Sequence, residues 1–382
     1  MNQRSRMKNI LTPKGWVLGR VVVDAAGLIA RIEGSPVTSP LLAAGYVLPG
    51  FIDLHVHGGG GTDLMDGETA ACVVAKTHAE YGTTSFLATT MTAPEDDLRV
   101  ATGHLGAAIR KPRGPGQSRI LGVHLEGPFL NANKRGSQPA HTRCAAPAEL
   151  DELLNIAHVR LVTLAPEIEG QLAIIRKLVE RGIRVQLGHS TGTYEQGLAA
   201  LQCGATGFAH LFNAMSGMHH RDPGIVGVAF AHAEYAEMIP DLLHVHPGAV
   251  KAAFRAIPKL YCITDSCSAV GMGEGEFTLG AQKVFRRRCE SGVRLADGTL
   301  AASTLTMDEA LRNLVSLGMT IADASDRLSR FPADFLGLQD RGRLVPGAWG
   351  DYVALSQNLA LEEVCIEGEH VKPASTISVE QP

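Results

Sequence analysis

The stretch PGFIDLHVHGGGG, residues 49–61, decides how the rest of the chain is interpreted. Apolar residues lead into His55 and His57, whose spacing of two puts both imidazoles on the same side of a strand. The glycines that follow form a flexible loop, and a strand that opens into a loop is typical of an active-site face. A lone His-x-His is as often a pair of packed, hydrogen-bonded side chains. Here Asp53 and the glycine-rich loop favour a metal site instead.

From Val47 onward, short apolar strands alternate with amphipathic stretches of helical period, which is typical of a parallel sheet with crossover helices. The expected strands are residues 50–55, 84–89, 120–125, 159–164, 183–187, 205–210, 236–243 and 259–264. The expected helices are residues 68–81, 94–109, 147–157, 168–181, 193–202, 247–257, 306–317 and 321–330. This pattern predicts an α/β fold of the (β/α)₈ TIM-type barrel, whose active site lies at the carboxyl ends of the strands.

The two ends of the chain have a different pattern from the barrel segment. Residues 16–33 read as two short strands around an Asp-Ala-Ala-Gly turn, and the chain returns to strands and turns after residue 342. We therefore expect a small β-sandwich domain made from residues 1–48 and 342–382, beside a barrel of residues 49–341. Residues 277–300 read as an excursion rich in turns, and its basic run at 286–288 as a solvated face.

The composition excludes several classes of partner. A net charge of -4 provides no basic surface for nucleic acid, and no window of 18 uninterrupted apolar residues indicates a membrane span. The seven cysteines are scattered without a C-x-x-C pair, which argues against a disulfide framework and against a cysteine zinc site. We expect a cytoplasmic protein whose partner is a small molecule.

Ionisable side chains collect where the predicted barrel strands end. One such residue is often satisfied by a neighbouring loop, but several histidines and two carboxylates at one barrel face favour a metal site. Nitrogen and carboxylate ligands without cysteine suit Zn²⁺ or Fe²⁺ in an open catalytic site, and such an ion lowers the pKa of water from 15.7 to about 7 for hydrolysis. The residues concerned are His55, His57, His124, Glu126, His189, His210, Asn213, His244, His246 and Asp265.

Several long motifs carry a family resemblance that runs in order from about residue 45 to residue 350. They are PGFIDLHVHGGGG, GVHLEGPFLNANKRG, LAPE, LGHST, HLFNAMSGMHHRDPG, TDSCSAVG and STLTMDEALRNLV. Together they resemble the N-acetylglucosamine-6-phosphate deacetylase family of the amidohydrolase superfamily. The resemblance implies a (β/α)₈ barrel with a small β domain from both chain ends. It also implies removal of acetate from the 2-acetamido group of the sugar phosphate.

The resemblance also implies roles for individual residues. Glu126, His189 and His210 resemble the ligands of a principal metal. His55 and His57 resemble the extra ligands of members that hold two ions, with Glu126 bridging, so one or two ions per chain are expected. Asp265 resembles the catalytic acid/base and is counted among the metal ligands, and His124 is considered as a group that polarises the carbonyl. The implied substrate-binding residues are Gln138, Asn213, Ala214, Arg221, His244, Thr304 and Leu305.

The place of Arg221 in its motif leads us to expect a dimer. In dimeric relatives the equivalent arginine reaches into the neighbouring subunit's site, so a homodimer is expected here. The simpler interpretation of Arg221 is a surface arginine paired with Asp222.

Three residues depart from the family pattern: Gln138 stands where a histidine often contacts the substrate, and Leu242 and Ala302 stand where glycines are usual. Three alternatives remain open. They are the same chemistry on a galactosamine epimer, a cyclic-amide hydrolase with a carboxylated lysine, and a sugar-phosphate sensor that has lost its chemistry. The last should lack the acid/base, yet Asp265 is present.

Overall fold

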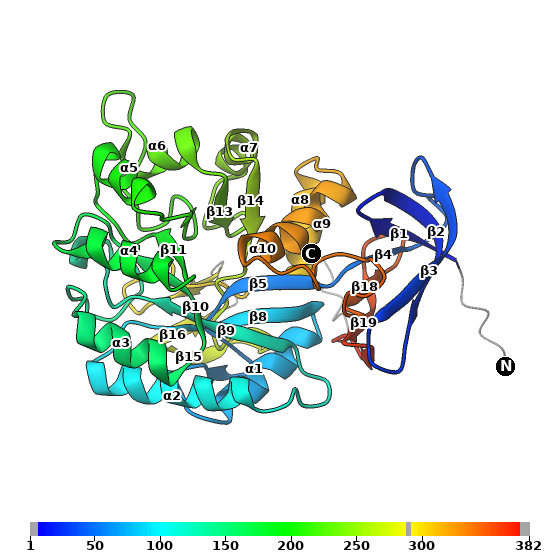
Figure 1. Ribbon diagram of the computed structural model, residues 1–382, viewed down its shortest axis with the longest axis horizontal. Coiled ribbons are helices and arrows are strands. Elements are labelled where there is room, and N and C mark those ends of the chain that lie inside the picture. The colour runs from blue at the N-terminus through cyan, green and yellow to red at the C-terminus, as the bar shows by residue number, and fades with distance from the viewer. Residues whose placement is uncertain (1–6, 288–291, 375–382) are drawn as a thin grey trace.

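The computed structural model describes residues 7–287 and 292–374, and its centre is a curled parallel sheet. Six strands pair in the order β12-β11-β10-β9-β8-β5, and all of these pairings are parallel. Figure 1 shows the helices α1 to α5 along this half-barrel. The strands are β5 (Phe51–Val56), β8 (Thr83–Thr90), β9 (Arg119–Glu126), β10 (Val159–Leu164), β11 (Arg184–Leu187) and β12 (Gly207–Phe208).

A second parallel pair, β13 (Tyr235–Met238) and β14 (Lys259–Cys262), follows in the chain. Backbone hydrogen bonds connect it to both edges of the half-barrel. The Leu211 N–H, just after β12, donates to the Glu237 carbonyl at 2.9 Å, and the Asp265 N–H, just after β14, donates to the His55 carbonyl at 3.0 Å. These contacts bring the carboxyl ends of the first and last strands together.

The helices between the strands agree with the amphipathic pattern of the sequence. Pro147 and Pro247 begin two of them at the first helical turn, where a missing N–H costs nothing. The helices are α1 (Ala70–Ala79), α2 (Glu95–Arg110), α3 (Pro147–Ile156), α4 (Gln171–Glu180), α5 (Tyr194–Gln202), α6 (Gly224–His232), α7 (Pro247–Ala256), α8 (Met307–Ser316), α9 (Ile321–Leu328) and α10 (Arg330–Phe335), with a 3₁₀ turn at Ala132–Lys134. None of the helices in the described part of the chain is long and apolar enough to cross a bilayer.

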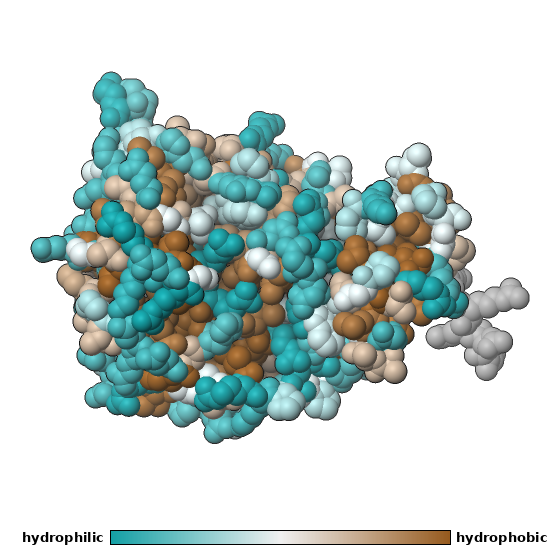
Figure 2. Space-filling view, viewed as in Figure 1, coloured by the Kyte–Doolittle hydropathy of each residue, from teal (hydrophilic) through white to brown (hydrophobic). Residues whose placement is uncertain are grey.

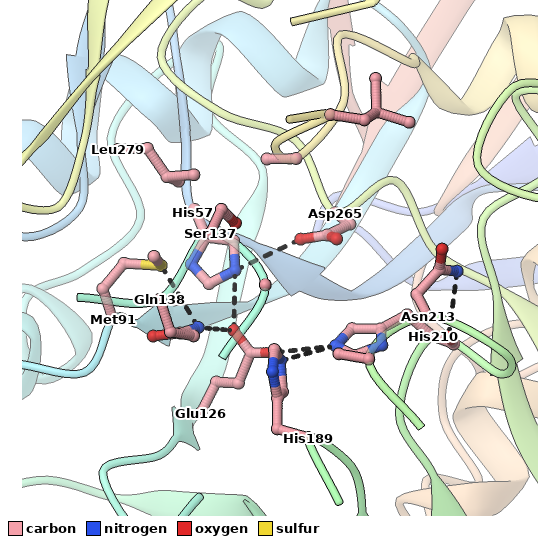
Figure 3. Close-up of a pocket in the computed structure, with 14 residues that line it drawn as sticks. His57, Met91, Glu126, Ser137, Gln138, His189, His210, Asn213, Asp265 and Leu279 are labelled. Carbon is pink, nitrogen blue, oxygen red and sulfur yellow. Dashed lines mark hydrogen bonds and ion pairs between the residues drawn. The ribbon is translucent and has the colours of Figure 1, made fainter. Parts of the chain in front are cut away.

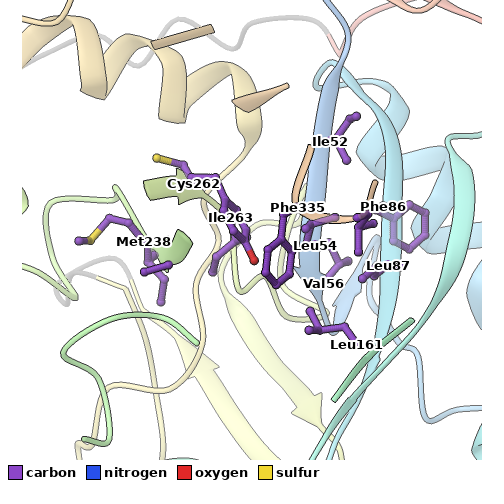
Figure 4. Packing of buried hydrophobic residues seen from close by; sticks show 14 of the residues in the cluster. Ile52, Leu54, Val56, Phe86, Leu87, Leu161, Met238, Cys262, Ile263 and Phe335 are labelled. Atoms are coloured by element: carbon purple, nitrogen blue, oxygen red, sulfur yellow. The ribbon is translucent and has the colours of Figure 1, made fainter. Parts of the chain in front are cut away.

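Strand β5 shows how the fold separates packing from chemistry. All six of its residues are buried, and from Ile52 onward apolar and polar side chains alternate. Ile52, Leu54 and Val56 lie in the main apolar cluster, where Figure 4 shows them near Phe86 of β8 and Phe335 of α10. The intervening Asp53 and His55 point to the interior of the barrel instead, because successive strand residues face opposite sides.

Both chain ends build one further sheet, of seven strands in the order β20-β19-β18-β4-β1-β2-β3. Figure 1 shows this sheet to one side of the barrel, and Figure 2 shows apolar side chains among the polar ones on its visible surface. Its pairing is antiparallel except between β1 and β4. The strands are β1 (Lys8–Thr12), β2 (Gly15–Val23), β3 (Ile29–Val37), β4 (Tyr46–Pro49), β18 (Tyr352–Leu355), β19 (Leu361–Ile366) and β20 (Glu369–Val371).

Several details differ from the sequence prediction. The strand expected at 236–243 ends at Met238, because Pro240 has no N–H to donate and Leu242 takes a left-handed φ of 62°. Helix α6 was missed because its residues are apolar on nearly all sides, so it has no amphipathic period.

The excursion at 277–300 contains a small antiparallel sheet of β15 (Gly275–Leu279), β16 (Gln282–Arg286) and β17 (Val293–Arg294), and a short hairpin pairs β6 (Gly58–Gly59) with β7 (Thr62–Asp63). Arg288, at the end of the basic run, and Cys289 lie outside the described residues.

Candidate metal centre and active site

A cavity opens where the barrel strands end, which is the usual place for a small-molecule site in such a fold. Figure 3 shows Glu126 near its centre, with imidazoles on either side of the carboxylate. The cavity is lined by His57, Met91, Glu126, Gly136, Ser137, Gln138, His189, His210, Asn213, Ala214, Asp265, Leu279, Leu300 and Ala302.

One group of donors gathers on a single oxygen of Glu126. The Oε1 atom lies 3.0 Å from His189 Nε2 and 2.9 Å from His210 Nε2, and the two nitrogens are 3.1 Å apart. The outer nitrogen of His189 faces the Lys134 carbonyl at 2.8 Å, so its inner nitrogen is directed at the carboxylate. Two imidazole nitrogens and a carboxylate in mutual contact fit an open divalent-metal site.

A second group of donors lies on the other side of the same carboxylate. His57 Nε2 is 3.2 Å from Glu126 Oε2 and 3.2 Å from His55 Nε2. Asp265 Oδ1 lies 3.3 Å from His57 Nε2 and 3.7 Å from His55 Nε2. Because facing imidazole nitrogens cannot all carry protons at these separations, a shared cation satisfies them best. The structure thus brings together all six predicted metal-binding side chains.

Three of these residues have left-handed backbone conformations. The φ angles are 49° at His189, 26° at His210 and 51° at Asp265. Each such residue costs of order 1–3 kcal/mol and persists only where neighbours hold it. At Asp265 the Ser303 N–H donates to the carbonyl at 2.7 Å, and Asp265 N–H is bonded to His55 as described above. The turns direct the side chains into the cavity as each strand ends.

Burial and opposite charges determine the protonation of the centre. Burial alone raises the pKa of a carboxylate, but His55 and the neighbouring imidazoles hold the pKa of Glu126 and of Asp265 well below their usual ranges. Burial lowers the pKa of His57, yet hydrogen bonds to Asp265 and Glu126 outweigh it and raise that pKa to about 9. The centre therefore contains ionised carboxylates that attract cations.

Three predicted substrate-binding residues lie in the cavity wall. Gln138 is buried, its Nε2 donates to Glu126 Oε2 at 2.5 Å and its Oε1 accepts the Thr92 N–H at 2.7 Å. Asn213 Nδ2 donates to the His210 carbonyl at 3.1 Å, and Ala214 follows it with a φ of 52°.

The other predicted substrate-binding residues lie outside this cavity. Arg221 is exposed, and its guanidinium contacts His220 Nε2 at 2.7 Å. His244 Nδ1 faces Asp241 Oδ2 at 2.6 Å, Thr304 is half-buried, and Leu305 is buried in the main apolar cluster. The chain's own fold does not bring these residues to the cavity.

Two of the histidines predicted at strand ends, His124 and His246, do not line the cavity. His124 is fully buried, its Nε2 faces the Thr163 hydroxyl at 2.8 Å, and burial holds its pKa well below the usual value. It does not line the cavity, which argues against the carbonyl-polarising role considered for it. His246 instead accepts the Gly248 N–H at 3.1 Å at the start of α7.

One further side chain, that of Glu237, contacts the centre and was not predicted from the sequence. Glu237 on β13 is fully buried, and its Oε2 lies 3.0 Å from His55 Nδ1. An acidic residue inside an apolar strand was the signal, since carboxylates are almost never fully buried without a partner. Met91, Leu279 and Leu300, which form an apolar part of the wall, gave no comparable signal.

Comparisons with known proteins agree with this geometry. The model of the amidohydrolase family matches residues 46–371. The N-acetylgalactosamine-6-phosphate deacetylase of Escherichia coli O157:H7 is 39% identical over 95% of this chain and 98% of its own length. The N-acetylglucosamine-6-phosphate deacetylase of Vibrio furnissii is 38% identical over 97% of this chain and 95% of its own length.

Solved structures of similar proteins share the fold over nearly the whole chain. The N-acetylglucosamine-6-phosphate deacetylase of Thermotoga maritima superposes with a TM-score of 0.87 at 31% identity and covers 97% of this chain and 99% of its own. A variant of the Mycobacterium smegmatis enzyme in complex with N-acetyl-D-glucosamine-6-phosphate gives a TM-score of 0.87 at 32% identity and covers 95% of this chain and 97% of its own.

Proposed function

This chain belongs to the amidohydrolase family of metal-dependent hydrolases, and from that premise we propose that it removes acetate from N-acetyl-D-glucosamine 6-phosphate. The products are acetate and D-glucosamine 6-phosphate, as expected for an enzyme of amino-sugar breakdown. One observation carries the proposal. Glu126 presents Oε1 to His189 and His210 and Oε2 to His57, in the wall of a cavity at the ends of the barrel strands.

The donor set supports Zn²⁺ or Fe²⁺, one or two per chain. Glu126, His189 and His210 would hold the principal ion, and His55 and His57 would hold a second ion next to Glu126, with Asp265 beside them. When bound, such ions supply a hydroxide nucleophile at neutral pH and polarise the acetamide carbonyl.

Asp265 is the proposed acid/base. Its side chain is 14% exposed and borders the cavity, and the neighbouring imidazoles hold its pKa below the usual range, so that it is ionised at neutral pH. It takes a proton from the attacking water and then delivers it to the departing amine. Gln138 holds Glu126 in place for this step by donating to Oε2.

The sugar and its phosphate are held at the mouth of the cavity. Asn213 and Ala214 line the cavity and border the sugar, while Thr304 and Leu305 lie behind the cavity-lining Ala302 in the chain and act from outside the cavity wall. His244 and Arg221 read the phosphate, since a guanidinium can bind a phosphate through two parallel hydrogen bonds. Because Arg221 lies outside the cavity of its own chain, we propose that it serves the neighbouring subunit of a homodimer.

The remaining proposals concern architecture and location. The barrel comprises residues 49–341 and closes as eight strands, supported by the hydrogen bonds that join β13 and β14 to the two edges of the half-barrel. The small domain comprises residues 1–48 and 342–382. Its seven-stranded sheet folds over as a sandwich, supported by a separate apolar cluster that includes Ile10, Ile29 and Leu344. The enzyme acts in the cytoplasm.

The decisive experiment combines an acetate-release assay on N-acetylglucosamine 6-phosphate with metal analysis of the same protein. We expect release that is abolished by a chelator and restored by Zn²⁺ or Fe²⁺. Release at the same rate from fully metal-free protein would contradict the metal-dependent proposal. Metal-loaded protein that releases no acetate would contradict the substrate.

N-acetylgalactosamine 6-phosphate is the second candidate substrate. The observation that favours it is the E. coli O157:H7 relative, whose name gives that substrate and which is 39% identical to this chain. The two sugars differ only in the configuration at one ring carbon. The ratio of kcat/KM on the two sugar phosphates, measured side by side, decides between them.

A further inference from the structure

Glu237 connects two of the proposed metal ligands through a single oxygen atom. Its Oε2 accepts from His55 Nδ1 at 3.0 Å and from the backbone N–H of His210 at 3.2 Å. Its other oxygen, Oε1, accepts from the Tyr261 hydroxyl at 3.3 Å, and that hydroxyl accepts from Gln186 Nε2 at 2.6 Å. Glu237 has no exposed surface, so these contacts replace water entirely.

The four imidazoles of the centre differ in what their outer nitrogens contact. The outer nitrogen of His189 faces a backbone carbonyl, that of Lys134. Those of His57 and His210 are buried and have no hydrogen-bond partner in the described structure. Only His55, of these four, directs its outer nitrogen at a carboxylate.

The contact with Glu237 fixes the chemical form of His55. With its proton on Nδ1 and directed at Glu237, the ring has its lone pair on Nε2. That nitrogen lies 3.2 Å from His57 Nε2 and 3.4 Å from Glu126 Oε1, toward the second group of donors. A carboxylate behind a ligating histidine fixes the ring and strengthens its lone pair.

We propose that Glu237 is a positioning residue that orients His55 and thereby sets the affinity of the second metal position. This inference rests on the proposed metal-dependent function, because it assigns His55 to an ion. Glu237 contacts the Nδ1 side of the His55 ring, opposite the nitrogen near Glu126, and acts through that ring. Its bond to the His210 backbone makes a smaller contribution at the principal position, where Glu126 and His189 remain in place.

The experiment measures stepwise Zn²⁺ binding to metal-free protein by competition with a chelating dye. In Glu237→Gln the shape of the side chain is kept but its charge is lost. We expect the second binding step to weaken by about 10- to 100-fold and the first by less than about threefold. Tyr261→Phe is the matched control: it removes the contact to Oε1 and leaves Oε2 and His55 untouched, so both steps should stay within about threefold.

A double-mutant cycle separates positioning from a general structural effect. In a His55→Ala background the second step is already weakened, and adding Glu237→Gln should weaken it by less than about threefold more, because the residue acts through His55. Additive losses in the cycle, equal losses at both steps, or a single Zn²⁺ site in the wild type would each overturn the proposal. Should Glu237→Gln fail to fold, Glu237→Asp keeps the charge but withdraws it from His55, and it should show the same selective loss. Because the readout is ion binding, a failure to release acetate would count against the substrate alone.

Discussion

His57 Nε2 lies 3.2 Å from Glu126 Oε2, while His210 Nε2 lies 2.9 Å from Oε1 of the same side chain. His55 Nε2 also lies 3.4 Å from Oε1, so both groups of imidazoles meet at this one buried carboxylate. A carboxylate in this position could serve two divalent ions.

Replacing His55 and His57 together by alanine should halve the bound metal. The second group of donors would lose both nitrogens, whereas the contacts of Glu126 with His189 and His210 would remain. Elemental analysis of protein loaded with excess Zn²⁺ or Fe²⁺ measures this. If the wild type never holds more than one ion per chain, the two-ion centre is wrong.

Asp265→Asn should reduce kcat by at least about 10²-fold, since a positioned acid/base contributes roughly 10²- to 10⁴-fold. The amide keeps the shape of the side chain but cannot accept a proton from water. Binding of the sugar phosphate should persist, which calorimetry on the inactive variant would show. A variant that retains more than about a tenth of the wild-type kcat would place the acid/base on another residue.

Arg221→Ala should impair the reaction of N-acetylglucosamine 6-phosphate and spare that of N-acetylglucosamine. Loss of a well-desolvated charge pair with the phosphate should cost about 2 to 4 kcal/mol of transition-state stabilisation, which is measured as a lower kcat/KM. Equal losses on both sugars, or no loss on either, would show that Arg221 does not read the phosphate.

Subunit mixing tests whether Arg221 acts across a dimer. Homodimers of Arg221→Ala and of Asp265→Asn should each be inactive, but a mixed dimer has one complete site, on the Arg221→Ala chain, if the arginine comes from the partner chain. Random mixing should then restore about a quarter of the wild-type activity. No recovery after verified exchange of subunits would assign Arg221 to its own chain.

Glu367 should contribute stability that is lost in acid. It lies in the turn between β19 and β20 and contacts Arg113, Arg119 and Arg341. Burial alone would raise its pKa, but Arg119 first, and Arg341 with it, lower the pKa from 4.5 to about 2. A depressed carboxylate pKa stabilises the fold fully above 4.5, and this stability disappears as the pH falls toward 2.

Urea unfolding at a series of pH values, for wild type and Glu367→Gln, measures this contribution. The variant should have a lower free energy of unfolding at neutral pH. Its free energy of unfolding should also change less than that of the wild type as the pH is lowered into the acid range. Burial raises the pKa of the neighbouring Asp351, and the Glu367 charge raises it further, so Glu367→Gln also removes this smaller effect. Glu362→Gln is a suitable control, because its ion pair with Lys8 is half-exposed and contributes about 1 kcal/mol or less. Parallel curves for wild type and Glu367→Gln would contradict the prediction.

Ala302→Gly should stabilise the protein by about 0.5 to 1 kcal/mol. Ala302 has a φ of 44°, a left-handed conformation that costs an L-residue about 1–2 kcal/mol. Glycine removes that strain. It also lowers the free energy of unfolding by about 0.5–1 kcal/mol, because a glycine has more conformational freedom in the unfolded chain. Ala301→Gly, beside it and without a positive φ, should destabilise instead. Urea unfolding of the two metal-free variants shows whether their effects have opposite signs.

The three departures from the family pattern show how far sequence comparison reaches. Leu242 and Ala302 were recognised as unusual because glycine is common there, and the structure supplies the reason: both have a positive φ. Gln138 was recognised as a change in the site, but its contact with Glu126 depends on a loop that the motif does not describe. The motif identifies the position, whereas the packing determines what the side chain contacts.

The sequence by itself determined the α/β class of the fold and, through the family resemblance, the six side chains of the proposed metal centre. Local pattern supports part of this: a period of two in β5 puts His55 on the interior face, and parallel strands bring their carboxyl ends to one face of a barrel. Strand and helix periods require no knowledge of distant residues.

Only the tertiary structure decided which distant side chains meet. Glu237 is 182 residues from His55, and no local period relates the two; they come into contact because β13 and β14 link to β5. Likewise Arg221 is close in sequence to the cavity residues Asn213 and Ala214, but its side chain lies outside the cavity. Its exposed loop directs the guanidinium to His220. Backbone periodicity is encoded over a few residues, but pairs of side chains depend on how whole strands are arranged, and that arrangement minimises the free energy of the entire chain.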